Sequence, residues 1–170
     1  VVDHAPAIAK DAFTPSGNWT REQLKIAFHF YCQTPFGKLH GRNPQIIELA
    51  KLIGRKPDAL AMKLGNFASL DPAITSSGRA GLKGASRLDR EIWEEFHSDW
   101  ERLAVECEQL RQSLLREHRL VMRGDTNTDY NIAIEDFTGE TRQAIVQLRI
   151  KQDFFRRAVL SSYRDRCCIS

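Results

Sequence analysis

Histidine and cysteine are the side chains best suited to metal binding or nucleophilic catalysis, and this chain of 170 residues has five of the first and four of the second. No two histidines are four residues apart, the helical spacing of a zinc-binding pair. Two of the cysteines are adjacent, whereas structural zinc sites use paired Cys-x-x-Cys motifs, so we expect reduced, buried thiols. We therefore assign no catalytic and no metal-ligating residue among His4, His29, His40, His97, His118, Cys32, Cys107, Cys167 and Cys168.

Three glycines that lie close together, Gly78, Gly81 and Gly84, raise the question of a phosphate-binding loop. Walker and Rossmann loops follow a strand, and a Walker loop ends in Gly-Lys-Ser/Thr. Neither feature occurs here, so nucleotide hydrolysis is not indicated. With its serines and no apolar period, the segment of residues 73–86 is predicted to be a mobile loop that carries two cations, Arg79 and Lys83.

Basic side chains are unevenly distributed along the chain, although the net charge is only +3. Residues 18–86 carry ten Lys and Arg against four Asp and Glu, and residues 137–170 carry seven against three. Residues 87–136 between them carry seven against thirteen. Two basic regions thus flank an acidic one, and basic regions suit a polyanionic partner because each cation near a phosphate releases counterions.

Three helices are predicted within residues 18–72, after a tail at residues 1–17. Thr20 and Gln23 form a capping box for the first helix, Asn43 and a proline open the second, and Pro57 opens the third. Each has an apolar face with helical spacing. These faces contain Leu24, Ala27, Phe28 and Tyr31, then Ile46, Ile47, Ala50 and Ile53, then Leu60, Ala61, Leu64, Phe67 and Ala68.

One long amphipathic helix is predicted over residues 87–119, because apolar residues recur there at steps of four or three. From Phe96 the steps alternate as in a coiled-coil seam, which continues through Trp100, Leu103, Cys107, Leu110 and Leu114. The seam could pack within the chain or form a homodimer, and the spacing leaves both open. A linker at residues 120–136 follows.

The last part of the chain, residues 137–170, is predicted to be a short α+β segment. Apolar residues alternate with others from Gln143 to Ile150, which is the period of a strand. Asp153 is then expected to cap a helix that contains Phe154 and Tyr163. The expected fold class is therefore mainly α, with a small α+β end.

The segment Trp19-Thr20-Arg21-Glu22, together with residues 47–64, resembles the three-helix Myb/SANT and homeodomain-like fold. That resemblance implies a third helix that enters the major groove of double-stranded DNA, although related modules can also bind protein. The chain departs from the pattern at the start of this helix, where Lys56 replaces the usual Thr or Ser. The implied DNA-binding residues are Arg55, Lys56 and Lys63 for phosphates, Asn66 for adenine, and Lys38, Arg42, Arg79 and Lys83 on the loops.

Two separated regions are similar to predicted HNH-type restriction endonucleases. They are residues 18–99, which include Thr34-Pro35-Phe36-Gly37 and Leu88-Asp89-Arg90-Glu91-Ile92-Trp93, and residues 139–170, which end in Cys167-Cys168-Ile169-Ser170. In that family the catalytic histidines follow a Cys-Ile-Ser/Thr-Gly turn, so the resemblance places them, and a divalent metal such as Mg²⁺, beyond Ser170. Residues 137–170 would then be the start of a nuclease domain.

Two other functions remain open from the sequence. The first is a transcription regulator that dimerises through residues 87–119, and the second is a helical interaction scaffold. No run approaches the roughly 18 apolar residues of a membrane span, and the first residues lack the layout of a signal peptide. We therefore expect a cytoplasmic protein with no membrane partner.

Overall fold

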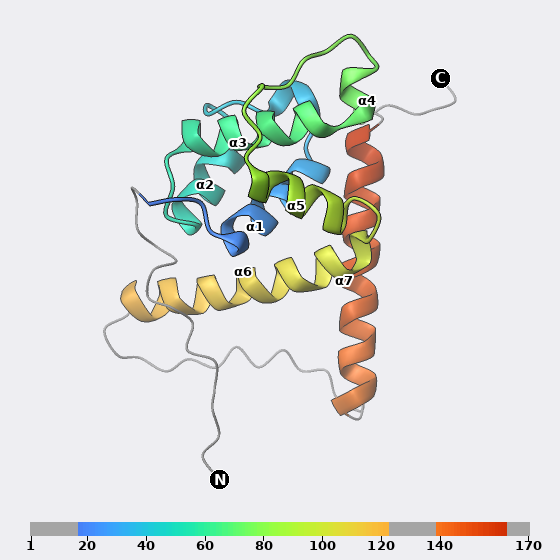
Figure 1. Cartoon of the computed structure of the whole chain (residues 1–170). Helices are drawn as coiled ribbons and strands as arrows, with labels where there is room; N and C mark the ends of the chain where they lie inside the picture. Colours follow the sequence, from blue (N-terminus) through green and yellow to red (C-terminus); the bar gives the residue numbers. More distant parts are fainter. Residues whose placement is uncertain (1–16, 123–138, 163–170) are drawn as a thin grey trace.

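The computed structural model describes residues 17–122 and 139–162, and every element in these ranges is helical (Figure 1). This confirms the expectation of a mainly α protein. The elements are α1 (Arg21–Cys32), the 3₁₀ helix η2 (Phe36–Lys38), α2 (Pro44–Leu52), α3 (Pro57–Leu70), α4 (Pro72–Thr75), α5 (Arg87–Phe96), α6 (Trp100–Met122) and α7 (Gly139–Ser162).

The first three helices begin where their capping residues predict. The Thr20 hydroxyl accepts from the Gln23 N–H at 3.3 Å, and the Gln23 side chain accepts from the Thr20 N–H at 3.2 Å. At α2 the Asn43 side chain accepts from the Gln45 N–H at 3.0 Å, ahead of a proline at the first position. α3 also begins with a proline, and Lys56 gives it no side-chain cap. Local capping chemistry thus fixes these three helix starts.

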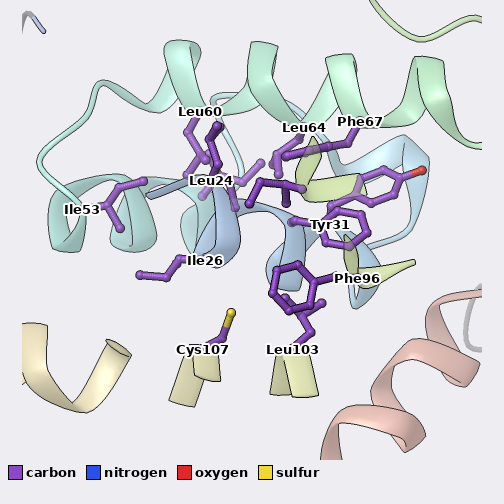
Figure 2. Close-up of a cluster of buried hydrophobic side chains, with 14 of the residues drawn as sticks. Leu24, Ile26, Tyr31, Ile53, Leu60, Leu64, Phe67, Phe96, Leu103 and Cys107 are labelled. Carbon is purple, nitrogen blue, oxygen red and sulfur yellow. The ribbon is translucent and has the colours of Figure 1, made fainter. Parts of the chain in front are cut away.

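α1 lies at the centre of the fold and packs against α3, α5 and α6. Its apolar face is buried as predicted, and so are most apolar residues expected on α2 and α3. Figure 2 shows side chains from α1, α3, α5 and α6 converging in one cluster. The wholly buried large side chains of this cluster include Leu24, Phe28, Ile46, Ile53, Leu60, Leu64, Phe67, Ile92, Phe96 and Leu103. Residues 18–72 therefore share their core with the helices that follow, and their arrangement as a homeodomain-like bundle stays a prediction.

The single long helix predicted over residues 87–119 is wrong, because α5 ends at Phe96 and α6 begins at Trp100. Asp99 accepts the N–H of Arg102 at 3.3 Å, so its carboxylate caps the start of α6. The break lets Phe96 and Leu103, on two differently directed helices, both reach the core beside α1. The sequence did not indicate this helix break, because the apolar spacing continues across it.

The predicted seam is largely buried within the chain. Phe96 and Leu103 are fully buried and Cys107 is 2% exposed, while Leu110 and Leu114 pack against the same core. These residues of the seam therefore pack within the chain. A homodimer through residues 87–119 would have to use other faces of the two helices.

The strand predicted within residues 143–150 and the separate helix from Asp153 are also wrong, since α7 is one helix from Gly139 to Ser162. Among its described side chains, Phe154 and Ala158 are buried and Ile150 is partly buried, and these follow helical spacing. Leu148, which the alternation placed on one face of a strand, is 55% exposed. α7 packs across α6 (Figure 1).

The segment of residues 73–86 contains most of the short helix α4, and its Leu82 N–H donates to the Gly65 carbonyl of α3 at 2.9 Å. Its predicted mobility is untested. Residues 1–16 of the tail, most of the linker and the Cys-Cys-Ile-Ser motif lie outside the described residues. No helix in the described ranges combines the length and the apolar character that a membrane span requires.

Candidate nucleic-acid interface

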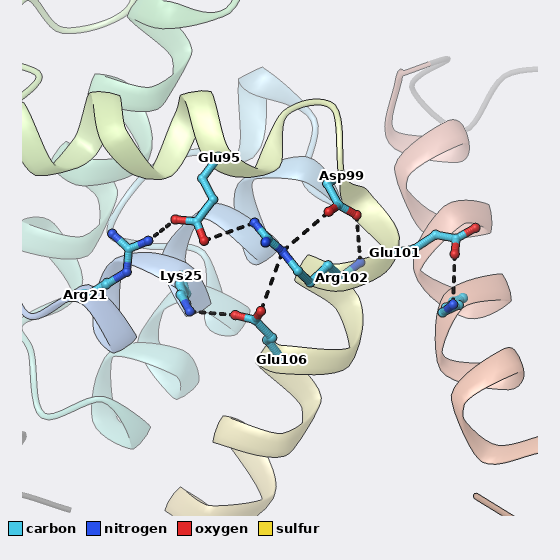
Figure 3. Close-up of polar contacts among 8 residues, drawn as sticks. Arg21, Lys25, Glu95, Asp99, Glu101, Arg102 and Glu106 are labelled. Atoms are coloured by element: carbon cyan, nitrogen blue, oxygen red, sulfur yellow. Dashed lines mark hydrogen bonds and ion pairs between the residues drawn. The ribbon is translucent and has the colours of Figure 1, made fainter. Parts of the chain in front are cut away.

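The acidic middle segment folds back onto the first basic region. Arg21 pairs with Glu95, and the Lys25 ammonium lies 2.6 Å from Glu106 (Figure 3). Arg102 links the same carboxylates from α6, at 3.0 Å from Glu95 and 3.7 Å from Glu106. Part of the positive charge that suggested a polyanion partner is therefore neutralised inside the protein.

Lys63, predicted to contact phosphate, forms an ion pair inside the fold. Its Nζ lies 2.8 Å and 3.0 Å from the two oxygens of Asp89, a residue with no exposed surface. The same carboxylate accepts the Ser86 N–H at 2.7 Å and so caps α5. Only 12% of the Lys63 side chain is exposed. Its ammonium thus balances a buried charge and is a poor candidate for a phosphate contact.

Arg55, the second predicted phosphate ligand, holds the segment that precedes α1. Its guanidinium donates to the carbonyls of Gly17 at 2.7 Å and Asn18 at 2.6 Å, and to the Gln23 side chain at 2.9 Å. It also lies over the Trp19 ring, 4.8 Å from the centroid. Most of the donors of Arg55 are therefore used within the chain.

The outer face of α3, predicted to enter the major groove, is open only in its first half. Met62 is 60% exposed, and Asp58 is exposed one turn before it. Further along, residues 81–84 lie against the helix, because a Cβ at Gly81 would overlap the backbone at Ser69. The absence of a side chain at Gly81 is what allows this close approach.

Asn66, predicted to read adenine, lies at the edge of this covered part of α3. A Cβ at Gly84 would be 3.5 Å from the Asn66 Oδ1, and Asn66 is only partly exposed. Its carbonyl accepts from the Ser69 hydroxyl at 2.6 Å. The overlying loop therefore restricts access to the side chain that was expected to contact a base.

The remaining predicted cations lie on the three segments that connect α1 to α2, α2 to α3, and α4 to α5. Lys56 precedes α3 and is exposed. Exposed Arg42 follows Gly41, where a Cβ would collide with the Asp58 carboxylate, so this loop also touches α3. We call the following set the basic rim: Lys38, Arg42, Lys56, Arg79 and Lys83.

Lys83 and Arg79, both between α4 and α5, form another side of the basic rim. Exposed Lys83 stands between Leu82, which is bonded to α3, and Gly84, which lies beside Asn66. The Arg79 guanidinium lies 5.8 Å from the centroid of Phe36 in η2, so the two loops meet there. The fold thus places Arg42, Lys56 and Lys83 on segments that touch or precede α3, with Arg79 at the Phe36 ring, Lys38 in the same 3₁₀ helix as Phe36, and Asp58 as an acidic neighbour.

Among the described histidines and cysteines, His29, Cys32 and Cys107 pack within the fold, whereas His40 and His97 are exposed. Burial, followed by the charges of Arg111 and Arg157, lowers the pKa of His29 to about 4, and its ring stacks on Phe154 at 4.8 Å. Burial raises the pKa of both the Cys32 and the Cys107 thiols, so neither is an activated nucleophile. Within residues 17–122 and 139–162, no three His, Cys, Asp or Glu side chains are grouped so that they could hold a metal ion.

Comparison of the chain with models of protein families, with curated proteins and with solved structures gives no match.

Proposed function

We propose that this chain binds double-stranded DNA through the basic rim, as the amino-terminal part of an HNH-type, restriction-like endonuclease. The observation that carries the proposal is the position of exposed Lys56, Arg42 and Lys83, which come from three separate elements and flank the open half of α3. The family assignment rests on the sequence resemblance. The proposal for this chain concerns binding.

The dimensions of α3 suit one face of a duplex. Its 14 residues span about 21 Å at about 1.5 Å per residue, which corresponds to about six base pairs at about 3.4 Å each. Phosphates on the two sides of one groove would then lie within reach of cations at both ends of the helix. Lys56 and Arg42 would contact one backbone, and Lys83 and Arg79 the other.

Base contacts would come from the start of α3. In helix-turn-helix proteins, the amino-terminal residues of the recognition helix reach the base edges. Asp58 could accept from a cytosine amino group, and Met62 could pack on a thymine methyl. The loop at residues 81–84 would meet the groove edge before Asn66 could enter, so most of the affinity in this proposal comes from phosphate contacts.

Cleavage in the family depends on histidines that follow the Cys-Ile-Ser/Thr-Gly turn and on a divalent metal. None of the described residues is proposed for either role.

The test is the affinity of the chain for a fluorescein-labelled duplex, measured by anisotropy. The variant Arg42→Glu/Lys56→Glu should bind at least roughly ten-fold more weakly, because two phosphate contacts become repulsive. The control Arg116→Glu/Arg119→Glu makes the same change in net charge at exposed positions of α6 and should retain affinity within roughly two-fold. Equal losses in the two variants, or no affinity in the wild type, would contradict the proposal.

A further inference from the structure

A pocket of about 500 Å³ lies between α1, η2, α4, α5, α6 and the end of α7. This volume falls in the range of small-molecule sites, roughly 300–1,000 Å³. Its lining includes Tyr31, Phe36, Asp71, Ala73, Trp93 and Trp100. None belongs to the basic rim or to the predicted DNA contacts.

Aromatic side chains form a large part of the pocket wall. The ring of Trp93 is 6.4 Å from that of Tyr31 and lies parallel to the ring of His97 at 5.9 Å. Trp100 is 37% exposed, and Phe36 of η2 also lines the pocket. Flat apolar walls suit a flat ligand, because aromatic rings stack with little loss of conformational freedom.

Asp71 supplies a polar group among these rings. Its Oδ2 accepts from the Tyr31 hydroxyl at 2.6 Å, and its Oδ1 accepts from the Ala73 N–H at 2.9 Å. A carboxylate oxygen has two lone pairs, so each oxygen can accept one further hydrogen bond. Burial raises the pKa of Tyr31, which keeps its hydroxyl a donor to Asp71. The pocket thus offers an acceptor to a ligand that carries N–H groups.

The edge of the pocket is shared with the basic rim. Phe36 lines the pocket, and the Arg79 guanidinium lies 5.8 Å from the centroid of the Phe36 ring. Exposed Lys38 belongs to the same 3₁₀ helix as Phe36. A cation on the Phe36 ring, with a second cation in the same short helix, favours a ligand that combines a flat, N–H-bearing ring with a negative charge.

We propose that this pocket receives a nucleobase with an exocyclic amino group, stacked between the aromatic side chains and bonded to Asp71, with its phosphate toward Arg79 and Lys38. Adenine, cytosine and guanine carry such a group, and thymine does not. The inference rests on the proposed function to the extent that the basic rim guides a strand to the pocket. A base in a duplex would have to leave the stack to enter, whereas an unpaired base or a free nucleotide would not.

A cation such as a quaternary ammonium is the alternative ligand for an aromatic pocket with a carboxylate. The charge around Phe36 argues against it, because Arg79 and Lys38 would repel a cation on approach. This alternative becomes one outcome of the test.

The experiment measures the binding of dCMP, TMP and tetramethylammonium to the whole chain by tryptophan fluorescence, and the binding of duplexes with one unpaired cytosine or thymine by anisotropy. We expect dCMP and the unpaired cytosine to bind more tightly than their thymine counterparts. Trp100→Ala should weaken dCMP binding at least roughly five-fold, as expected when a stacking ring is lost.

The variant Ala73→Trp removes none of the aromatic side chains and should fill the pocket from an exposed position on α4. It should abolish dCMP binding and the preference for an unpaired cytosine, and it should leave the affinity for a fully paired duplex within roughly two-fold. The control Ala144→Trp, on an exposed face of α7, should change neither.

The inference about the pocket is overturned if dCMP does not bind, if Ala73→Trp binds it as well as the wild type, or if tetramethylammonium binds instead. Any of these results together with normal binding of a paired duplex would leave the proposed function intact. Loss of duplex binding in Arg42→Glu/Lys56→Glu with normal dCMP binding would show that the pocket works apart from the basic rim.

Discussion

Replacing Lys63 with methionine would separate stability from DNA binding on α3. Methionine keeps much of the length of the side chain and removes its charge, which leaves the fully buried Asp89 carboxylate without its cation. Breaking a buried ion pair by removing one partner costs about 3–5 kcal/mol. The remaining hydrogen bond from the Ser86 N–H compensates Asp89 only in part. We expect a loss near the lower figure.

A loss of about 3 kcal/mol lowers the melting temperature of a domain of this size by roughly 6–12 °C. The assay is urea unfolding followed by circular dichroism, with thermal unfolding as a second measurement. The matched control is Lys56→Met, at an exposed position directly before the same helix, where we expect a change within about 0.5 kcal/mol.

The variant that loses stability should keep its affinity for DNA, and the variant that keeps its stability should lose affinity. At a temperature where both are folded, Lys63→Met should bind a duplex as the wild type does, and Lys56→Met should bind it more weakly. In the double variant Lys63→Met/Asp89→Asn, part of the lost stability should return, because the buried carboxylate is no longer charged. An unfolding free energy of Lys63→Met within about 1 kcal/mol of the wild type would refute the reasoning.

Three further predictions concern other contacts. Arg55→Lys should lower stability by about 1–2 kcal/mol in thermal unfolding, because an ammonium cannot reach Gly17, Asn18 and Gln23 together; Arg90→Lys, at an exposed position, should not. NMR titration should place the pKa of His29 at about 4, below its usual 6.5. His29 then contributes up to about 3 kcal/mol to the free energy of unfolding, which is present above pH 6.5 and lost as the pH falls toward 4. The variant His29→Gln should flatten this pH dependence. A measured pKa near 6.5 would contradict the prediction. Gly81→Ala should displace the loop from α3 and speed hydrogen exchange at the Leu82 amide, whereas Gly37→Ala, with no atom within 4 Å of the added Cβ, should have no effect on this amide.

The parts of the fold that local chemistry determines could be read from the sequence. The starts of α1, α2 and α3 follow from a capping box, an Asn-Pro pair and a proline, all of which act within a few residues. The buried faces follow from helical spacing. A strand was wrongly predicted within α7 because a short alternating apolar run is compatible with either a strand or a helix. Packing against α6 favours the helix.

The roles of individual cations could not be read in the same way. Lys63 and Asp89 are 26 residues apart, and Arg55 and Gly17 are 38 residues apart, so nothing local marks either pair. One feature of the sequence did indicate internal ion pairs. Residues 87–136 have an excess of Asp and Glu, and the described part of this segment folds onto residues 18–86, which have an excess of Lys and Arg. The aromatic pocket was missed because its lining residues come from six elements scattered along the chain.

The most direct test of DNA binding by the basic rim is the dependence of duplex affinity on salt concentration. If several rim cations contact phosphates, a plot of the logarithm of the association constant against the logarithm of salt concentration should be steep for the wild type. For Lys56→Met the slope should be shallower by about one unit, because one phosphate contact is lost. For Lys63→Met the slope should equal that of the wild type. A flat plot for the wild type, or a shallower slope for Lys63→Met than for Lys56→Met, would contradict the proposal.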